Sequence, residues 1–129
     1  MKKTLLFVAF ILLLSGCANK WAVMRDANRV AMNQVEIGMT KTDVVRIMGN
    51  HSVYGPAVGT YQNPYKRETL KGDNGKTYDV LYYYTQEIGR KSIESGLTPV
   101  VFLSGKVEGI GWNYLDSVGG NITATLKRR

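Results

Sequence analysis

The chain has 129 residues, of which 44% are hydrophobic and 21% are charged, a composition that excludes collagen-like, coiled-coil and wholly disordered proteins. It contains a single Cys, so no disulfide can form within the chain. Lys and Arg number 17 against 10 Asp and Glu, which gives a net charge of +7 and favours contact with anionic surfaces.

The first residues have the pattern of a secretory signal. Lys2 and Lys3 precede an apolar run over residues 5–14, and the small residues Ser15 and Gly16 follow it. A helix of this apolar run would be about 15 Å long, half the thickness of a bilayer's hydrocarbon core. The sequence therefore predicts a signal peptide over residues 1–16 that is removed from the mature protein.

The cleavage region points to lipidation. Leu14-Ser15-Gly16-Cys17 resembles the lipobox of bacterial lipoproteins, in which the Cys is lipidated on sulfur and becomes the first residue. A thiolate is well suited to accept a lipid group, and the only Cys of the chain stands where the motif requires it. A plain signal peptide with a chance Cys is the alternative. The resemblance implies three acyl chains on Cys17, enough for effectively permanent anchoring.

The residues after Cys17 indicate to which membrane the lipoprotein is sorted. Ala18 and Asn19 follow it, and the sorting rule of enteric-type bacteria retains lipoproteins with Asp in the second position at the inner membrane. By resemblance to that rule, the sequence predicts the periplasmic face of the outer membrane, ahead of the inner membrane. We expect residues 17–23 to be the lipidated Cys and a short tether, which holds the domain close to its membrane.

Two helices are predicted next. Apolar side chains at helical spacing define the expected inner face of the first, and polar ones its outer face. The inner set is Val23, Ala27, Val30, Ala31 and Val35, and the outer set is Arg25, Asp26, Asn28, Arg29 and Asn33. The second helix begins after Thr40, an N-cap residue with Asp43 three positions on, and ends at Gly49.

The second half of the chain predicts a sheet. Strands are expected over residues 78–86, 98–103 and 106–114, with turns at Asn74-Gly75 and Ser104-Gly105. Gly109 and Gly111 share one face of the last strand, where a helix or aromatic ring can approach closely. Residues 51–71 show no periodicity and are predicted to be an irregular loop with room for a short edge strand. Residues 88–97 are predicted to be a mobile hairpin loop.

These elements predict an α+β fold in which two N-terminal helices pack on a three-stranded antiparallel sheet as a two-layer sandwich. The domain is expected over residues 24–118. Residues 119–129 form a basic tail that we expect to be disordered.

Catalytic and metal-binding patterns are missing from the sequence. His51 is the only His, and no Ser lies in a Gly-x-Ser-x-Gly motif, so a Ser-His-Asp triad has no support. No thiol remains free after lipidation, and there is no His pair, calcium loop or nucleotide-binding glycine motif. We therefore predict a protein that is not an enzyme and has no metal or cofactor. Export removes nucleic acid as a partner, and anionic lipid head groups are the expected counter-charge.

The eight Tyr residues are the remaining functional clue. Consecutive residues of a strand point to opposite faces, so Tyr82, Tyr83 and Tyr84 cannot all enter one core. One face is expected to pack on the helices, and the other is either a half-wet surface or a docking surface. The candidate partner-binding residues are Tyr54, Tyr61, Tyr65, Tyr83, Trp112 and Tyr114.

Several of these motifs together resemble a known class. The Gly38-Met39-Thr40 turn, a short helix ending in Met48-Gly49, the Tyr-rich strand and the Gly105-Lys106 turn leading to Gly111-Trp112 resemble the SmpA/OmlA (BamE-like) small outer-membrane lipoproteins. Residues 78–86 and 98–102 resemble more closely a related family of uncharacterised proteobacterial lipoproteins. The class includes the accessory subunit of the barrel-assembly machine.

The resemblance implies a two-helix, three-stranded fold that acts through protein contacts. The chain departs from the class in carrying His51 where a Pro usually follows the helix, in its longer 51–71 segment and in its short tether. The first hypothesis is a lipid-anchored, non-catalytic accessory or scaffold in outer-membrane protein assembly or envelope integrity, whose partners are envelope proteins, either the barrel-assembly machine or another. The alternative is a periplasmic ligand-binding or inhibitory module for a peptide, peptidoglycan or an enzyme.

Overall fold

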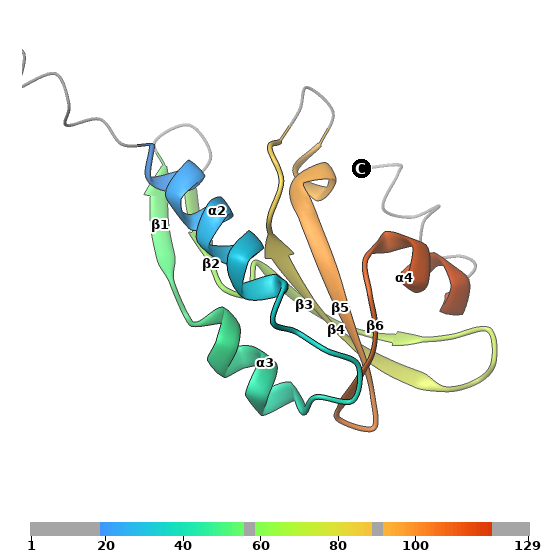
Figure 1. Cartoon of the computed structure of the whole chain (residues 1–129). Coiled ribbons are helices and arrows are strands. Elements are labelled where there is room, and N and C mark those ends of the chain that lie inside the picture. Colours follow the sequence, from blue (N-terminus) through green and yellow to red (C-terminus); the bar gives the residue numbers. More distant parts are fainter. Residues whose placement is uncertain (1–18, 56–58, 89–91, 120–129) are drawn as a thin grey trace, which may run out of the picture.

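The computed structural model describes residues 19–55, 59–88 and 92–119 (Figure 1). The predicted signal peptide over residues 1–16, the predicted lipidation site Cys17 and the tail beyond Gly119 lie outside the described residues. The first described helix begins at Lys20, three residues before the point at which the sequence pattern placed it.

The described chain forms an α+β fold with two antiparallel sheets. The smaller sheet pairs two strands, and the larger has the order β3-β4-β5-β6. In chain order the elements are α2 (Lys20–Met32), α3 (Lys41–Met48), β1 (Ser52–Gly55), β2 (Gly59–Gln62), β3 (Lys66–Lys71), β4 (Thr77–Tyr84), the 3-10 helix η2 (Ile93–Gly96), β5 (Leu97–Leu103), β6 (Lys106–Ile110) and α4 (Trp112–Val118). The predicted α+β class is confirmed. The predicted three-stranded sheet and two-layer arrangement are wrong, because the main sheet has four strands and is covered on both faces.

Helix α3 is the best-predicted element. The Thr40 hydroxyl accepts from the Asp43 backbone N–H at 3.2 Å and donates to the Asp43 carboxylate at 2.7 Å. Gly49 ends the helix with a φ of 68°, a conformation that costs glycine little. Val44 and Met48 then face the core, so local capping and burial agree along this segment.

Helix α2 is rotated relative to the sequence prediction. Val23 and Val30 were expected inside but are 60% and 65% exposed, whereas Asn28 was expected outside and is 1% exposed. Trp21 and Met24 pack into the core in place of the valines. Burying larger apolar side chains stabilises more than burying valines, and the polar Asn28 amide is fully compensated by hydrogen bonds.

The buried Asn28 forms a reciprocal amide pair with Asn63. Asn28 Nδ2 donates to Asn63 Oδ1 at 2.9 Å, and Asn63 Nδ2 donates to Asn28 Oδ1. Each amide also donates to a backbone carbonyl: Asn28 Nδ2 donates to the Tyr84 carbonyl, and Asn63 Nδ2 donates to the Met48 carbonyl, both at 2.8 Å. The pair therefore connects α2, the end of α3, the end of β4 and the segment between β2 and β3.

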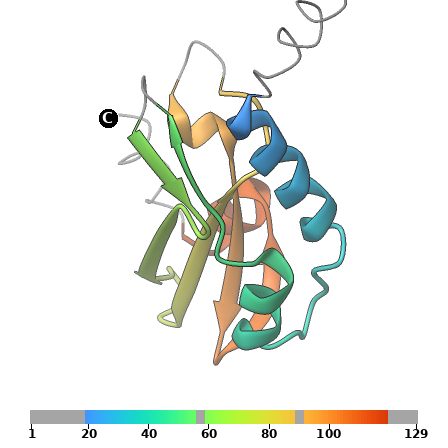
Figure 2. The same cartoon turned by 90° about the vertical axis from the view of Figure 1, so that its left-hand side faces the viewer.

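Both faces of the four-stranded sheet are covered (Figures 1 and 2). On one face α3 contributes Val44 and Met48, and on the other α2, β2 and α4 contribute Met24, Tyr61 and Leu115. The first core contains Leu81, Tyr83, Val100, Phe102 and Val107 from the sheet, and the second contains Tyr78, Val80, Tyr82, Tyr84, Leu97 and Val101. Alternate residues of β4 enter the two cores, as strand geometry requires.

The segment over residues 51–71, predicted to be an irregular loop with room for a short edge strand, contains three strands, of which β3 is an edge strand of the main sheet. Its described residues form β1, β2 and β3, and β3 pairs with β4 from Lys66 opposite Tyr82 to Lys71 opposite Thr77. Strand β3 reads Lys-Arg-Glu-Thr-Leu-Lys and contains few residues that favour strands. Pairing with the apolar β4 determines its conformation, which is why the isolated sequence pattern missed it.

Two further differences follow in the second half of the chain. The expected hairpin loop over residues 88–97 contains η2, while residues 89–91 lie outside the described part. The predicted strand over residues 106–114 ends at Ile110, because Gly111 turns the backbone with a φ of 91° and α4 begins at Trp112. The turn folds α4 back over β6, so that the Tyr114 ring lies against Gly109.

The Gly109 contact can be tested by substitution. A Cβ at this position would overlap the Tyr114 ring, so Gly109→Ala should lower the free energy of unfolding by about 2 kcal/mol, as overpacking does. The same substitution in a Tyr114→Ala background should cost much less, since the clash is removed. Denaturant unfolding of the four proteins measures both values, and equal costs in the two backgrounds would contradict the packing.

Candidate interaction surface

The structure places two of the predicted partner-binding residues in the core. Tyr61 is 1% exposed and Tyr83 is 0% exposed. Tyr83 lies under α3, and Tyr61 lies among Trp21, Tyr65 and Tyr84. The expectation of an exposed aromatic sheet face is therefore wrong, because secondary-structure elements cover both faces.

The other predicted residues are spread over the domain. Trp112 is partly buried, with its ring 5.7 Å from the Tyr82 ring and its Nε1 donating to the Leu97 carbonyl at 2.8 Å. Tyr114 packs on Gly109, and Tyr65 packs on Tyr61. Tyr54 is 70% exposed and is the one predicted aromatic that is fully available to a partner. The aromatic residues thus mainly build the fold.

The buried phenols differ in how their hydroxyls are satisfied. Tyr82 donates to Glu68 at 2.8 Å, whereas the hydroxyls of Tyr61 and Tyr83 have no hydrogen-bond partner among the described residues. Burial raises the pKa of Tyr83 to about 12, with the Arg67 charge opposing the shift, and burial raises the pKa of Tyr61 to about 12. Burial and the Glu68 hydrogen bond also raise the pKa of Tyr82.

The two edges of the main sheet differ. At the β6 edge, Gly38 N–H donates to the Val107 carbonyl and Val107 N–H donates to the Met39 carbonyl, both at 2.8 Å. Lys41 N–H donates to the Gly105 carbonyl at 3.0 Å, and Thr40 forms a bridge with Lys106. The turn before α3 therefore pairs with β6 like a short additional strand.

The β3 edge carries no such cover among the described residues. Strand β3 pairs with β4 on one side only, and no described segment pairs with its other side. Every second residue of an edge strand directs its backbone N–H and carbonyl outward, where another strand can pair with them. We call this side of Lys66–Lys71 the open edge.

The side chains of the open edge are predominantly basic. Lys66 pairs with Glu68 at 3.1 Å and lies over the Tyr82 ring, so the Glu68 carboxylate is already engaged by Lys66 and Tyr82. Arg67 and Lys71 are exposed and have no acidic partner among the described residues. The open edge therefore presents two unneutralised cationic groups.

A small polar network fixes the middle of the β3–β4 hairpin. Asp79 accepts from the Thr69 hydroxyl at 2.9 Å and from Lys41 at 3.2 Å. The hydrogen bond from Thr69 lowers the pKa of the Asp79 carboxyl most, and the hydrogen bond from Lys41 lowers it further. The charge of Asp79 is thereby directed at α3 and not at the Arg67 and Lys71 side chains.

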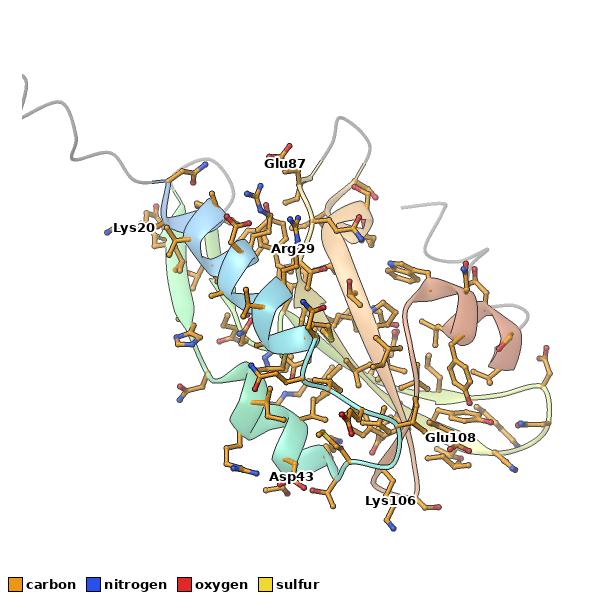
Figure 3. The ribbon with its side chains drawn as sticks, viewed as in Figure 1. Lys20, Arg29, Asp43, Glu87, Lys106 and Glu108 are labelled. Carbon is orange, nitrogen blue, oxygen red and sulfur yellow. The ribbon has the colours of Figure 1, made fainter. Side chains whose placement is uncertain are left out.

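A polar groove runs beside α2. Arg25, Arg29, Gln86 and Glu87 line a cavity of about 680 Å³, and a neighbouring one of about 230 Å³ also includes Arg29 and Gln86. Arg29 Nε donates to the Thr85 carbonyl at 3.1 Å, and Arg25 pairs with Asp26 and Glu87. Figure 3 shows Arg29 reaching from α2 toward the chain that follows β4.

Other site types find no geometric support. His51 is exposed, and its imidazole lies against Gly49. Within residues 19–55, 59–88 and 92–119, no three His, Cys, Asp or Glu residues cluster closely enough to hold a metal ion. No helix in this same part of the chain is both long and apolar enough to cross a membrane.

No family model, curated protein or solved structure matches this chain. The similarity to the SmpA/OmlA class therefore stays a prediction from the sequence motifs. The sequence analysis allowed only a short edge strand within residues 51–71, and the signal that could have placed β3 is the Asn74-Gly75 turn, which joins it to β4 as a hairpin.

The assignment of Tyr83 to the core has a measurable consequence. Tyr83→Phe removes a buried hydroxyl without a partner, so the free energy of unfolding should stay constant or rise by about 1 kcal/mol. The matched variant Tyr82→Phe loses a hydrogen bond to a carboxylate, so its free energy of unfolding should be lower by about 1.5 kcal/mol. Denaturant unfolding at neutral pH compares the two; a larger loss in Tyr83→Phe would contradict the assignment.

The same phenol gives a pH dependence. Because the folded pKa of Tyr83 is raised to about 12 from the ordinary 10, its contribution is fully present below pH 10 and is lost as the pH rises toward 12. The free energy of unfolding of Tyr83→Phe, measured by denaturant unfolding, should therefore fall less steeply between pH 10 and pH 12 than that of the unsubstituted chain.

Proposed function

We propose that this chain is a lipid-anchored protein of the periplasmic face of the outer membrane that acts as a non-catalytic accessory or scaffold for envelope proteins. Its role is in outer-membrane protein assembly or envelope integrity, with either the barrel-assembly machine or another envelope protein as its partner. The open edge of β3 is the observation that carries this proposal.

The open edge supports a protein partner because strand addition is a common mode of peptide and protein recognition. An exposed edge is also a liability, which folds usually remove by covering the strand. This chain covers the β6 edge with its own backbone and leaves β3 uncovered among the described residues. A surface available to a partner accounts for the difference.

The anchor is supported by the sequence and by the start of the fold. Asn19 accepts a hydrogen bond from Trp21 N–H as the N-cap of α2, and it stands two residues after Cys17. Two residues span about 7 Å at most. A lipid on Cys17 would therefore hold the first turn of α2 at the bilayer surface.

Processing tests the anchor. Cys17→Ser should prevent lipidation and leave the signal peptide attached, because the lipoprotein signal peptidase acts on the modified Cys. Immunoblotting should show a larger, precursor-sized band, and metabolic labelling with palmitate should disappear. Ser15→Ala keeps a small residue before the cleavage site and serves as the control. A mature-sized band in Cys17→Ser would contradict the lipobox assignment.

Crosslinking in intact cells tests the protein contact. A photoreactive residue at Thr69, in the centre of the open edge, should capture an identified envelope protein, and one at Tyr54 tests the exposed aromatic. Thr42 is exposed on α3 and is the control position, where no capture is expected. Barrel-assembly components at Thr69 would favour that machine, and a different envelope protein would favour a separate partner. No captured protein at either Thr69 or Tyr54 would contradict the accessory role.

The groove beside α2 favours a second candidate, a ligand-binding or inhibitory module for a peptide, peptidoglycan or an enzyme. Arg29 is held in place by the Thr85 carbonyl, and its guanidinium is a suitable donor for a carboxylate. The groove is lined by charged and polar side chains and lacks the apolar lining of typical small-molecule sites. The open edge therefore supports the accessory role more directly.

A further inference from the structure

Among the residues that the structure describes, the open edge of β3 combines an unpaired backbone with positive charge that has no acidic partner. Arg67 and Lys71 are four positions apart, lie on the same face of the strand and are about 13 Å apart along it. Neither has an acidic partner among the described residues. The nearby Glu68 carboxylate is engaged by Lys66 and Tyr82. The Asp79 carboxylate is engaged by Lys41 and Thr69. An occupant of this edge must therefore supply negative charge at a matching spacing.

A second copy of the chain is a poor occupant. A twofold axis would bring the two β3 strands together antiparallel and must pair residues that point to the same face, so centring on Thr69 places Arg67 of one copy opposite Lys71 of the other. Like charges that face each other across paired strands are destabilising. The chain's own terminal residues Lys127, Arg128 and Arg129 are unsuitable for the same reason.

We propose that the open edge binds an extended acidic segment of a partner protein, which adds to the main sheet as a fifth strand beside β3. This inference rests on the proposed accessory role and names the chemistry of its partner. Acidic side chains four residues apart in the segment pair with Arg67 and Lys71, and the intervening residues on the opposite face lie near the half-buried Leu70. Backbone hydrogen bonds to β3 hold the segment, and the two cations select it over neutral or basic strands.

A defined peptide tests this proposal on the full chain purified in detergent. The probe is fluorescein-labelled Thr-Glu-Val-Thr-Val-Glu-Thr, which places two Glu on one face and two Val on the other when extended. Fluorescence anisotropy should show saturable binding that weakens as salt is added. The same peptide with Lys in place of both Glu, and a version N-methylated at alternate residues, should each bind at least about tenfold more weakly.

Charge reversal separates the open edge from general electrostatic attraction. The double variant Arg67→Glu, Lys71→Glu should lose binding of the Glu peptide and gain binding of the Lys peptide. The control variant Lys20→Glu, Lys106→Glu makes the same change in net charge at exposed positions elsewhere and should keep the original preference (Figure 3). Equal loss in both variants, or undiminished binding of the N-methylated peptide, would overturn the proposal.

The outcomes also distinguish this inference from the accessory role. Capture of an envelope protein at Thr69 in cells, without peptide binding in solution, would overturn the acidic-strand inference and keep the accessory role. Peptide binding with no capture in cells would keep the inference about the edge and contradict the accessory role.

Discussion

The buried amide pair of Asn28 and Asn63 is the interaction on which the arrangement of the other elements depends. Two side chains that are 35 residues apart in the sequence satisfy each other and the carbonyls of Met48 and Tyr84. An unpaired amide at either position would cost about 1–3 kcal/mol, so the pair favours one rotation of α2 and one path from β2 to β3. The exposure of Val23 and Val30 is a consequence, because the helix face that holds Asn28 also brings in Trp21 and Met24.

The same arrangement explains why the aromatic residues are structural. With α3 and the last turn of α2 on one face of the sheet, and the start of α2, β2 and α4 on the other, the alternating tyrosines of β4 enter two separate cores. A sheet that is covered on both faces can offer a partner only its edges, its helices' outer faces or its loops. Since the turn before α3 closes the β6 edge, β3 is the edge of the main sheet that stays accessible among the described residues.

Local chemistry determined which elements could be predicted from sequence. Helix α3 follows from Thr40, Asp43 and Gly49, and the β5–β6 hairpin follows from Ser104-Gly105, whose φ values of 50° and 78° are both positive. The burial of Asn28 could not be predicted, because its partners Asn63 and Tyr84 are distant in the sequence. Strand β3 could not be predicted from its own residues, which show no apolar alternation, although it pairs with the next strand, β4, as a hairpin. The exposed edge was hidden for a related reason, since a Lys-rich strand that avoids aggregation resembles a polar loop.

The proposed lipid anchor would orient the domain on the membrane, because the open edge lies away from the start of α2. In both views the first turn of α2 lies at one end of the domain, and the β3–β4 hairpin extends toward the other (Figures 1 and 2). A lipid on Cys17 would hold the first end against the bilayer, because the Asn19 cap stands only two positions after it. The open edge would then face away from the head groups, whose negative charge would otherwise compete for Arg67 and Lys71. A short tether and a distant basic edge therefore suit a protein that is held at a membrane and binds its partner in the periplasm.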